Sequence, residues 1–152
     1  MDKFLEQLKI VFASEFSFYL KAHYFHWNVE GSDFKQLHDL FGGIYEEVYA
    51  SIDPFAEQIR AAKGYTPGSL TRFSMLTEID DSTAQYTAGA MVFELLQDSD
   101  KLAEMFKIAF KMAEANGEHG LSNFLADRMD AHRKHSWMLR ATSKVNADQA
   151  GI

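Results

Sequence analysis

Apolar and polar positions along this chain repeat with the period of an α-helix, not that of a strand. Apolar residues recur three or four positions apart over four long stretches, and the 152 residues include only two prolines. The pattern predicts helices over about Lys3–Val29, from Ser32 or Asp33 to about Lys63, from Ser82 or Thr83 to Asn116-Gly117, and over about Leu121–Ser143. We therefore expect an all-α chain with four long helices.

The breaks between these stretches predict how the helices connect. Gly31-Ser32 and Asn116-Gly117 are short turn sequences, so helices one and two, and helices three and four, should form two hairpins. The connection between the hairpins is longer, with turn residues over 64–69 and room for a short helix over Leu70–Leu76. We expect a four-helix bundle with a short helix in the crossover between helices two and three.

Composition narrows the class of protein. The chain is 47% hydrophobic, enough for one core, and we expect a single domain over residues 1–152. It shows no signal-peptide pattern and no apolar run near the ~20 residues of a membrane span, which favours a cytoplasmic protein without a membrane partner. Since cysteine is absent, His, Asp and Glu are the available metal ligands. The net charge of -7 makes nucleic acid an unexpected partner.

Two histidines flank the first turn. Steps of seven along the apolar stripe, from Leu5 through Phe12 and Tyr19, reach His26, which should face inward. His38 follows the turn, and an antiparallel hairpin would bring it to a similar height. The pair suggests a metal site, although each histidine alone is also compatible with a hydrogen-bonded core or surface position.

Asp53 and Glu57 place two carboxylates on one face of the second helix. Like charges four positions apart cost a few tenths of a kcal/mol unless a cation compensates them. They form either a solvated acidic face or part of a metal site. His38 and Asp53 are fifteen positions apart, which at ~1.5 Å per residue separates them by ~22 Å. One chain cannot bring both to one ion, but a second subunit packed about a two-fold axis can, so the spacing predicts an oligomer.

A di-iron centre inside one bundle would need Glu on two helices and Glu-x-x-His on the other two. The chain contains no Glu-x-x-His. His132-x-x-His135 is the nearest substitute, but we interpret it as packing or surface because no accompanying Glu is evident, and we assign it no ligand role.

The first histidine belongs to a longer motif. His26-Trp27-Asn28-Val29-Glu30-Gly31, followed by Asp33-Phe34, Leu37-His38 and Asp53-x-x-Ala56-Glu57, resembles the ferroxidase segment of the Dps proteins in both residues and spacing. The loop with Pro67-Gly68-Ser69-Leu70 is similar to the family's connecting loop, and residues 134–141 are similar to its last helix. The likeness covers nearly the whole chain.

The resemblance implies a ferritin-like four-helix bundle that assembles into a homo-oligomeric shell, a dodecamer. Such a mini-ferritin would act as a ferroxidase, oxidising Fe(II) with hydrogen peroxide or dioxygen, and would store ferric iron and protect against oxidative stress. His26 and His38 would be the catalytic and metal-binding residues of one subunit, with Asp53 and Glu57 from its partner. Iron is the cofactor that the resemblance implies, and Trp27 would lie close to it.

The chain departs from the family pattern at Gly42, where members usually carry an Asp four residues after the second histidine. A missing carboxylate should weaken a second iron position, and Glu46 or Asp39 is a candidate replacement. A site that holds one tight ion and oxidises it slowly fits equally well. Pro54, between Asp53 and Glu57, removes one helical hydrogen bond, and we interpret it as a mild bend that the shell tolerates.

Two further interpretations concern iron entry and DNA. Glu114, Glu118 and Asp127 supply acids near the start of the last helix, where the family has its iron pores, or they form ordinary solvated surface. The family's DNA binding often depends on a lysine-rich terminal extension, and these termini carry few lysines. We expect weak or absent DNA binding.

Three classes of function remain open at the level of sequence. The favoured one is a ferroxidase and iron store. The second is a Dps-like shell with an impaired site that sequesters metal or binds DNA, an alternative to which Gly42 lends some support. The third is an unrelated bundle with accidental ligand spacing, which the mass of the assembled protein would test.

Overall fold

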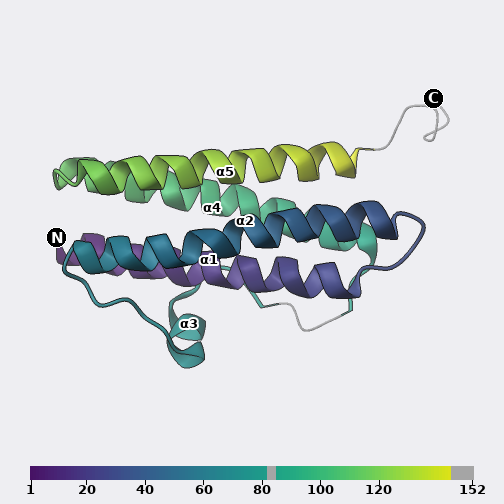
Figure 1. Cartoon of the computed structure of the whole chain (residues 1–152), viewed down its shortest axis with the longest axis horizontal. Coiled ribbons are helices and arrows are strands. Elements are labelled where there is room, and N and C mark those ends of the chain that lie inside the picture. The colour runs from purple at the N-terminus through teal and green to yellow at the C-terminus, as the bar shows by residue number, and fades with distance from the viewer. Residues whose placement is uncertain (82–84, 145–152) are drawn as a thin grey trace.

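A computed structural model describes residues 1–81 and 85–144 of this chain, and every regular element in these residues is a helix. In chain order the helices are α1 (Asp2–Asn28), α2 (Phe34–Ala61), α3 (Leu70–Leu76), α4 (Ala88–Ala115) and α5 (His119–Ser143). The four long helices lie side by side in an elongated bundle, and α3 lies outside it, below α1 (Figure 1). The structure confirms the all-α four-helix bundle with a short helix in the crossover.

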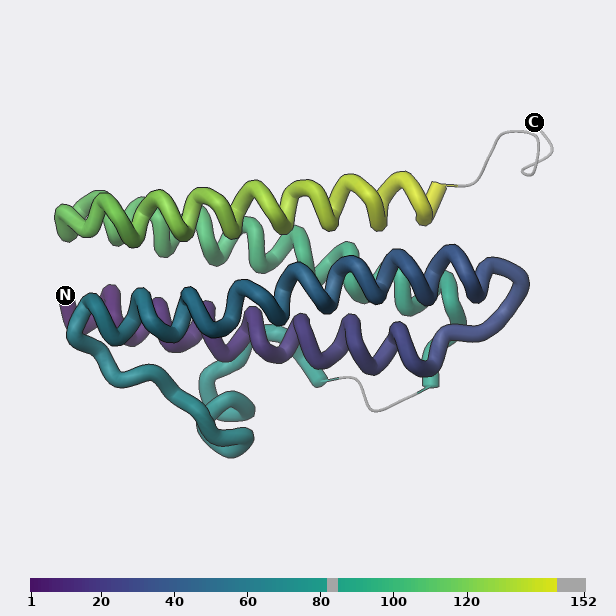
Figure 2. The backbone as a smooth tube through the Cα atoms, in the orientation of Figure 1, coloured from purple at the N-terminus to yellow at the C-terminus, as the bar shows by residue number. Residues whose placement is uncertain are grey.

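Two hairpins, α1–α2 and α4–α5, make up the bundle (Figure 2). Each turn contains a glycine in a conformation that side chains rarely adopt, with φ of +117° at Gly31 and +71° at Gly117. The N-terminus and the α4–α5 turn lie at one end of the bundle, and the α1–α2 turn lies at the other (Figure 2). This arrangement places the residues on either side of Gly31 together at one end of the molecule.

The crossover between the hairpins differs from the prediction at one point. The third long helix was expected to begin at Ser82 or Thr83, residues that lie outside the described part of the chain. Instead α4 begins at Ala88, because the Thr87 hydroxyl accepts a hydrogen bond from the Ala90 backbone N–H at 3.2 Å and caps the helix. The short helix α3 has the predicted bounds, and its cap Ser69 accepts from the Arg72 N–H.

Large aromatic side chains fill the core, among them the fully buried Phe4, Phe18, Phe25, Phe41, Phe55 and Phe106. Tyr19, which the sequence pattern assigned to the apolar stripe of the first helix, is only half-buried, as is Phe16 one turn before it. Phe16 faces α3, where its ring stacks on that of Phe73 with centroids 4.6 Å apart, whereas Tyr19 contacts Tyr45 and Tyr49 of α2. No helix in the described residues is long and apolar enough to cross a membrane.

Candidate metal centre

His26 near the end of α1 and His38 in the first turns of α2 lie against each other across the hairpin. Their imidazole rings stack with centroids 3.7 Å apart and planes 17° from parallel. His26 Nδ1 lies 2.6 Å from the His38 carbonyl oxygen, and His38 Nδ1 lies 2.7 Å from the His26 carbonyl oxygen. The structure thus brings this predicted pair together, as the hairpin argument required.

These two reciprocal hydrogen bonds decide which ring nitrogens are free. A carbonyl oxygen can only accept a hydrogen bond, so each Nδ1 carries the hydrogen and donates it. In the neutral rings each Nε2 then keeps a lone pair, and within the described residues neither Nε2 has a hydrogen-bond partner. A histidine whose Nδ1–H is held by a backbone carbonyl has the arrangement that metal-binding histidines usually show.

Gly42 lies one turn after His38 and is buried under the His26 ring. A Cβ atom at this position would lie 3.1 Å from His26 Cε1 and 3.2 Å from His26 Nδ1, closer than side chains normally pack. The next residue, Gly43, has nothing within 4 Å of its Cβ position. A side chain at position 42, where the family pattern expects a carboxylate, would therefore require the His26 ring to shift by a few tenths of an ångström.

A third histidine, which the sequence reasoning missed, lies one turn before His26 on α1. The His23 ring stacks on Tyr45 of α2 with centroids 3.8 Å apart and planes 6° from parallel, and the Trp27 ring lies 4.1 Å away. His23 Nδ1 is 3.1 Å from the Tyr19 hydroxyl. Burial and the nearby His26 lower the pKa of His23. Because His23 lies three positions before His26, helical spacing could have predicted that the two histidines share a face of α1.

The carboxylates at positions 53 and 57 do not join the histidines within one chain. Asp53 and Glu57 are exposed and lie far along α2, and no group of three potential ligands in the described residues could hold a metal ion. The candidate replacements for the missing carboxylate are also exposed, and Asp39 forms an ion pair with Lys35 at 3.1 Å. Within one subunit the two histidines and the two carboxylates therefore do not meet.

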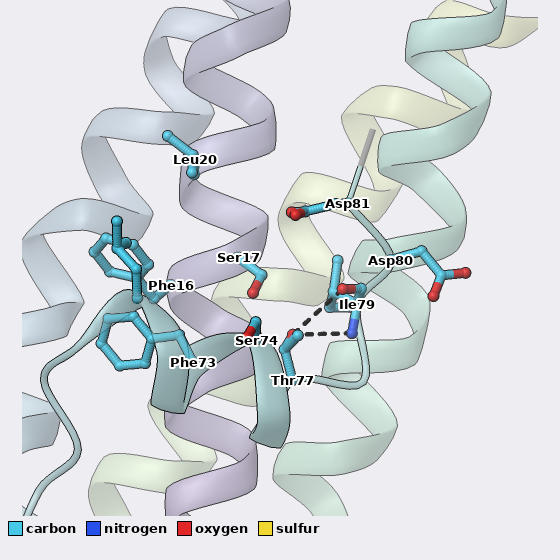
Figure 3. A pocket seen from close by; sticks show the side chains of 10 residues that line it. Phe16, Ser17, Leu20, Phe73, Ser74, Thr77, Ile79, Asp80 and Asp81 are labelled. Atoms are coloured by element: carbon cyan, nitrogen blue, oxygen red, sulfur yellow. Dashed lines mark hydrogen bonds between the residues drawn. The ribbon is translucent and has the colours of Figure 1, made fainter. Parts of the chain in front are cut away.

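The surface around α3 is apolar and grooved. A cavity of about 530 Å³ opens between α1, α3 and the segment after α3, with Phe16, Leu20 and Phe73 on one side and Asp80 and Asp81 on the other (Figure 3). Large side chains in this region are exposed: Leu20, Leu70 and Met75 have relative exposures of 41%, 75% and 69%. An exposed apolar surface of this kind typically marks a contact with another protein chain.

A layer of charged side chains crosses the middle of the bundle and includes His132 and His135. Both histidines are buried, which confirms the packing interpretation, but both have the glutamate partners that seemed to be lacking. His132 Nε2 lies 2.5 Å from Glu15 Oε1, and His135 Nε2 lies 2.7 Å from Glu47 Oε1. The sequence did contain one indication of this layer. Glu15 lies three positions from both Phe12 and Phe18, so a carboxylate falls among the buried residues of α1.

Arg128 joins the two glutamates of this layer. Its Nε lies 3.0 Å from Glu15 Oε2, and its two terminal nitrogens bind both oxygens of Glu47. Burial raises the pKa of Glu47, but hydrogen bonds from His135 and Arg128 outweigh it and lower the value to about 2. Burial likewise raises the pKa of Glu15, and the charges of His132 and Arg128 reverse the shift. The carboxylates of Glu15 and Glu47 are therefore both paired with the Arg128 guanidinium.

The acids suggested for iron entry lie at the α4–α5 turn and on α5. Glu114 accepts a short hydrogen bond from Ser122 and another from His119 at 3.4 Å, and these bonds lower its pKa. Glu118 is the N-cap residue of α5, and Asp127 is exposed. Their role in iron entry stays a prediction.

Comparison with known proteins places this geometry in a family. The model of the ferritin-like domain matches residues 5–145. The chain is 31% identical over 140 residues to the DNA protection during starvation protein of Helicobacter pylori strain J99, covering 91% of this chain and 97% of that protein.

Solved structures agree with the sequence comparison. Dps from Staphylococcus aureus superposes with a TM-score of 0.91 at 27% identity, covering 96% of this chain and 98% of that one. Dps from Vibrio cholerae, described as a member of a broad superfamily of ferritin-like diiron-carboxylate proteins, gives a TM-score of 0.89 at 25% identity over 94% of this chain and 90% of that one.

Proposed function

Because this chain belongs to the Dps family of ferritin-like proteins, we propose that it is the subunit of an iron-storing shell that oxidises Fe(II) at sites shared between two subunits. Membership of this family supports a general role as an iron-storing mini-ferritin. The ferroxidase chemistry, the dodecamer and the ligand set are the proposal. The observation that carries it is the stacked pair of His26 and His38, whose Nε2 atoms have no hydrogen-bond partner among the described residues.

The ligand set is completed by Asp53 and Glu57 of a second subunit. Two histidines with one or two carboxylates are a common ligand set for non-haem Fe(II). The carboxylates also favour oxidation, since their negative charge stabilises Fe(III) more than Fe(II). The exposed apolar surface and groove around α3 on the α1 side of the molecule support an interface between copies of the chain. Each two-fold dimer would then hold two equivalent sites.

The residues of the chain perform separate tasks at this site. The two backbone carbonyls fix the tautomers and orientations of His26 and His38, so the nitrogen ligands need no rearrangement when Fe(II) binds. Asp53 and Glu57 are exposed in the single subunit, so they are free to reach a partner. Hydrogen peroxide or dioxygen takes the electrons, and the ferric product is stored in the shell.

One experiment tests oxidation. The metal-free oligomer is titrated with Fe(II) without oxygen, hydrogen peroxide is added, and ferric absorbance is followed. We expect fast oxidation in the wild type and its loss in the Asp53→Ala, Glu57→Ala double variant. Equally slow oxidation in both proteins would leave the alternative, a shell that only sequesters metal or binds DNA, which the lack of a carboxylate at Gly42 favours.

A second experiment tests whether the sites are shared. The His26→Ala, His38→Ala variant and the Asp53→Ala, Glu57→Ala variant should each be inactive as pure oligomers. Dissociated and reassembled together, they should regain activity, because a mixed dimer contains one site with both intact histidines and both intact carboxylates. No recovery in mixed oligomers of normal mass would show that the sites are not shared in this way.

A further inference from the structure

A series of aromatic rings leads away from the proposed iron site along α1 and α2. The Tyr45 ring lies 5.2 Å from that of His26 and stacks on that of His23. The Tyr19 ring follows at 5.7 Å from His23, and Tyr49 lies 4.9 Å from Tyr19. These centroid distances leave no gap between the site and Tyr19. Such close contact permits an electron to pass between the rings and the site.

Tyr19 has the one feature that a tyrosine needs in order to give up an electron readily. A phenol loses its hydrogen ion when it is oxidised, so a base must be in place to receive it. The Tyr19 hydroxyl lies 3.1 Å from His23 Nδ1 and can donate its hydrogen to that atom. Among the described residues, the hydroxyls of Tyr45 and Tyr49 have no hydrogen-bond partner, and Trp27 is 58% exposed. Tyr19 is therefore the favoured donor.

A site with a single iron supplies one electron too few to reduce hydrogen peroxide to water, and a nearby electron donor in the protein would supply the second. Reduction of hydrogen peroxide to water takes two electrons, whereas one Fe(II) supplies one. Position 42, where the family pattern expects a carboxylate for a second iron, is a glycine and supplies none. A site with one tightly held iron would release a hydroxyl radical unless a second electron came from the protein.

We propose that Tyr19 supplies this second electron and that His23 accepts its proton, an inference that rests on the proposed ferroxidase function. One Fe(II) becomes Fe(III), the Tyr19 phenol becomes a neutral tyrosyl radical, and its O–H hydrogen ion moves to His23 Nδ1. The O–O bond of one hydrogen peroxide breaks, and the two electrons together with two protons from solvent convert it to two water molecules. Charge and atoms balance with His23 in its protonated form.

The test uses the assembled protein loaded with Fe(II) without oxygen, mixed with hydrogen peroxide and frozen within the first turnover. Electron paramagnetic resonance detects the radical, and protein grown with ring-deuterated tyrosine distinguishes a tyrosyl signal, which narrows, from a tryptophanyl signal. Tyr19→Phe keeps the ring and its packing on Tyr49 but removes the hydroxyl. Tyr65→Phe is the matched control, since Tyr65 is exposed on the loop after α2 and packs under Arg60.

We expect a tyrosyl signal in the wild type and in Tyr65→Phe, its loss in Tyr19→Phe, and a weaker signal in His23→Gln. Spin trapping should detect more hydroxyl radical from Tyr19→Phe than from the wild type. Ferric absorbance in the same samples separates the two proposals. If iron is oxidised but no tyrosyl radical forms, or if the radical survives in Tyr19→Phe, this inference fails alone. If iron is not oxidised, the ferroxidase proposal fails with it.

Discussion

The imidazole of His26 occupies the space that a side chain at position 42 would need, and its Nδ1–H is held by the His38 carbonyl. The glycine at position 42 therefore leaves the site without a carboxylate and gives the His26 ring a few tenths of an ångström of room that a Cβ would take. The neighbouring Gly43 has no such contact, so the two glycines have different structural roles.

Alanine substitutions separate these roles. Gly43→Ala should raise the free energy of unfolding by about 1 kcal/mol, because alanine is the better helix former and its Cβ meets nothing. Gly42→Ala should gain less stability than Gly43→Ala and bind Fe(II) or Zn(II) more weakly, because its Cβ displaces His26. Chemical denaturation and anaerobic metal titration give the two quantities. Unchanged metal affinity in Gly42→Ala would show that the ring does not depend on this space.

At the scale of elements, the bundle is held by apolar packing and by one charged layer. Glu15 comes from α1, Glu47 from α2 and Arg128, His132 and His135 from α5. The Ser99 hydroxyl of α4 donates to the His132 carbonyl at 3.0 Å, so all four long helices take part. A buried group of this kind costs desolvation energy and makes no apolar contribution. Its effect is to align the helices, since the charges are compensated in one arrangement only.

Removing the Arg128 side chain should therefore lower the free energy of unfolding. Arg128→Ala leaves the fully buried Glu15 without its permanently charged partner, and we expect it to lower the free energy of unfolding by about 3 kcal/mol. Arg133→Ala on the exposed face of α5 is the control and should change stability by less than about 0.5 kcal/mol. Urea denaturation followed by circular dichroism measures both. Similar small losses in the two variants would mean that the layer does not hold the helices together.

For the whole molecule, the same layer predicts how stability depends on pH. The pKa of Glu47 in the folded protein is about 2, below its ordinary 4.5, so its contribution is complete above pH 4.5 and is lost as the pH falls from 4.5 toward 2. Because its side chain is 41% exposed, solvent screening reduces this contribution to about 1 kcal/mol.

Melting temperatures measured at pH 7 and pH 3 test this linkage. The wild type should lose more stability between these two values than Glu47→Gln, in which the carboxylate cannot take up a proton. An equal loss in both proteins would place the acid-sensitive groups elsewhere, with Glu15, whose pKa is also lowered, as the next candidate.

The charge of the whole chain predicts its behaviour toward DNA. A net charge of -7 without a basic run opposes contact with phosphates, so purified shells should not retard plasmid in a gel at physiological salt. Retardation that disappears on raising the salt concentration would contradict this expectation and would favour the DNA-binding alternative.

The sequence by itself determined the features that depend on local periodicity. Helix positions, both tight turns and the short crossover helix follow from apolar spacing and turn residues, and the equal height of His26 and His38 follows from helical rise and the position of Gly31. The start of α4 was predicted too early because polar capping residues occur both at Ser82 or Thr83 and at Thr87, and local sequence does not rank them.

Only the tertiary structure decided the contacts between residues far apart in the chain. Glu15 meets His132 over a separation of 117 residues, and Arg128 meets Glu47 over 81, so spacing within one helix contains no information about either pair. The free Nε2 atoms and the Tyr19–His23 bond likewise depend on side-chain orientations that the packing of α1 on α2 fixes. Periodicity specifies which face of a helix is buried, whereas partners across the bundle are set by three-dimensional packing.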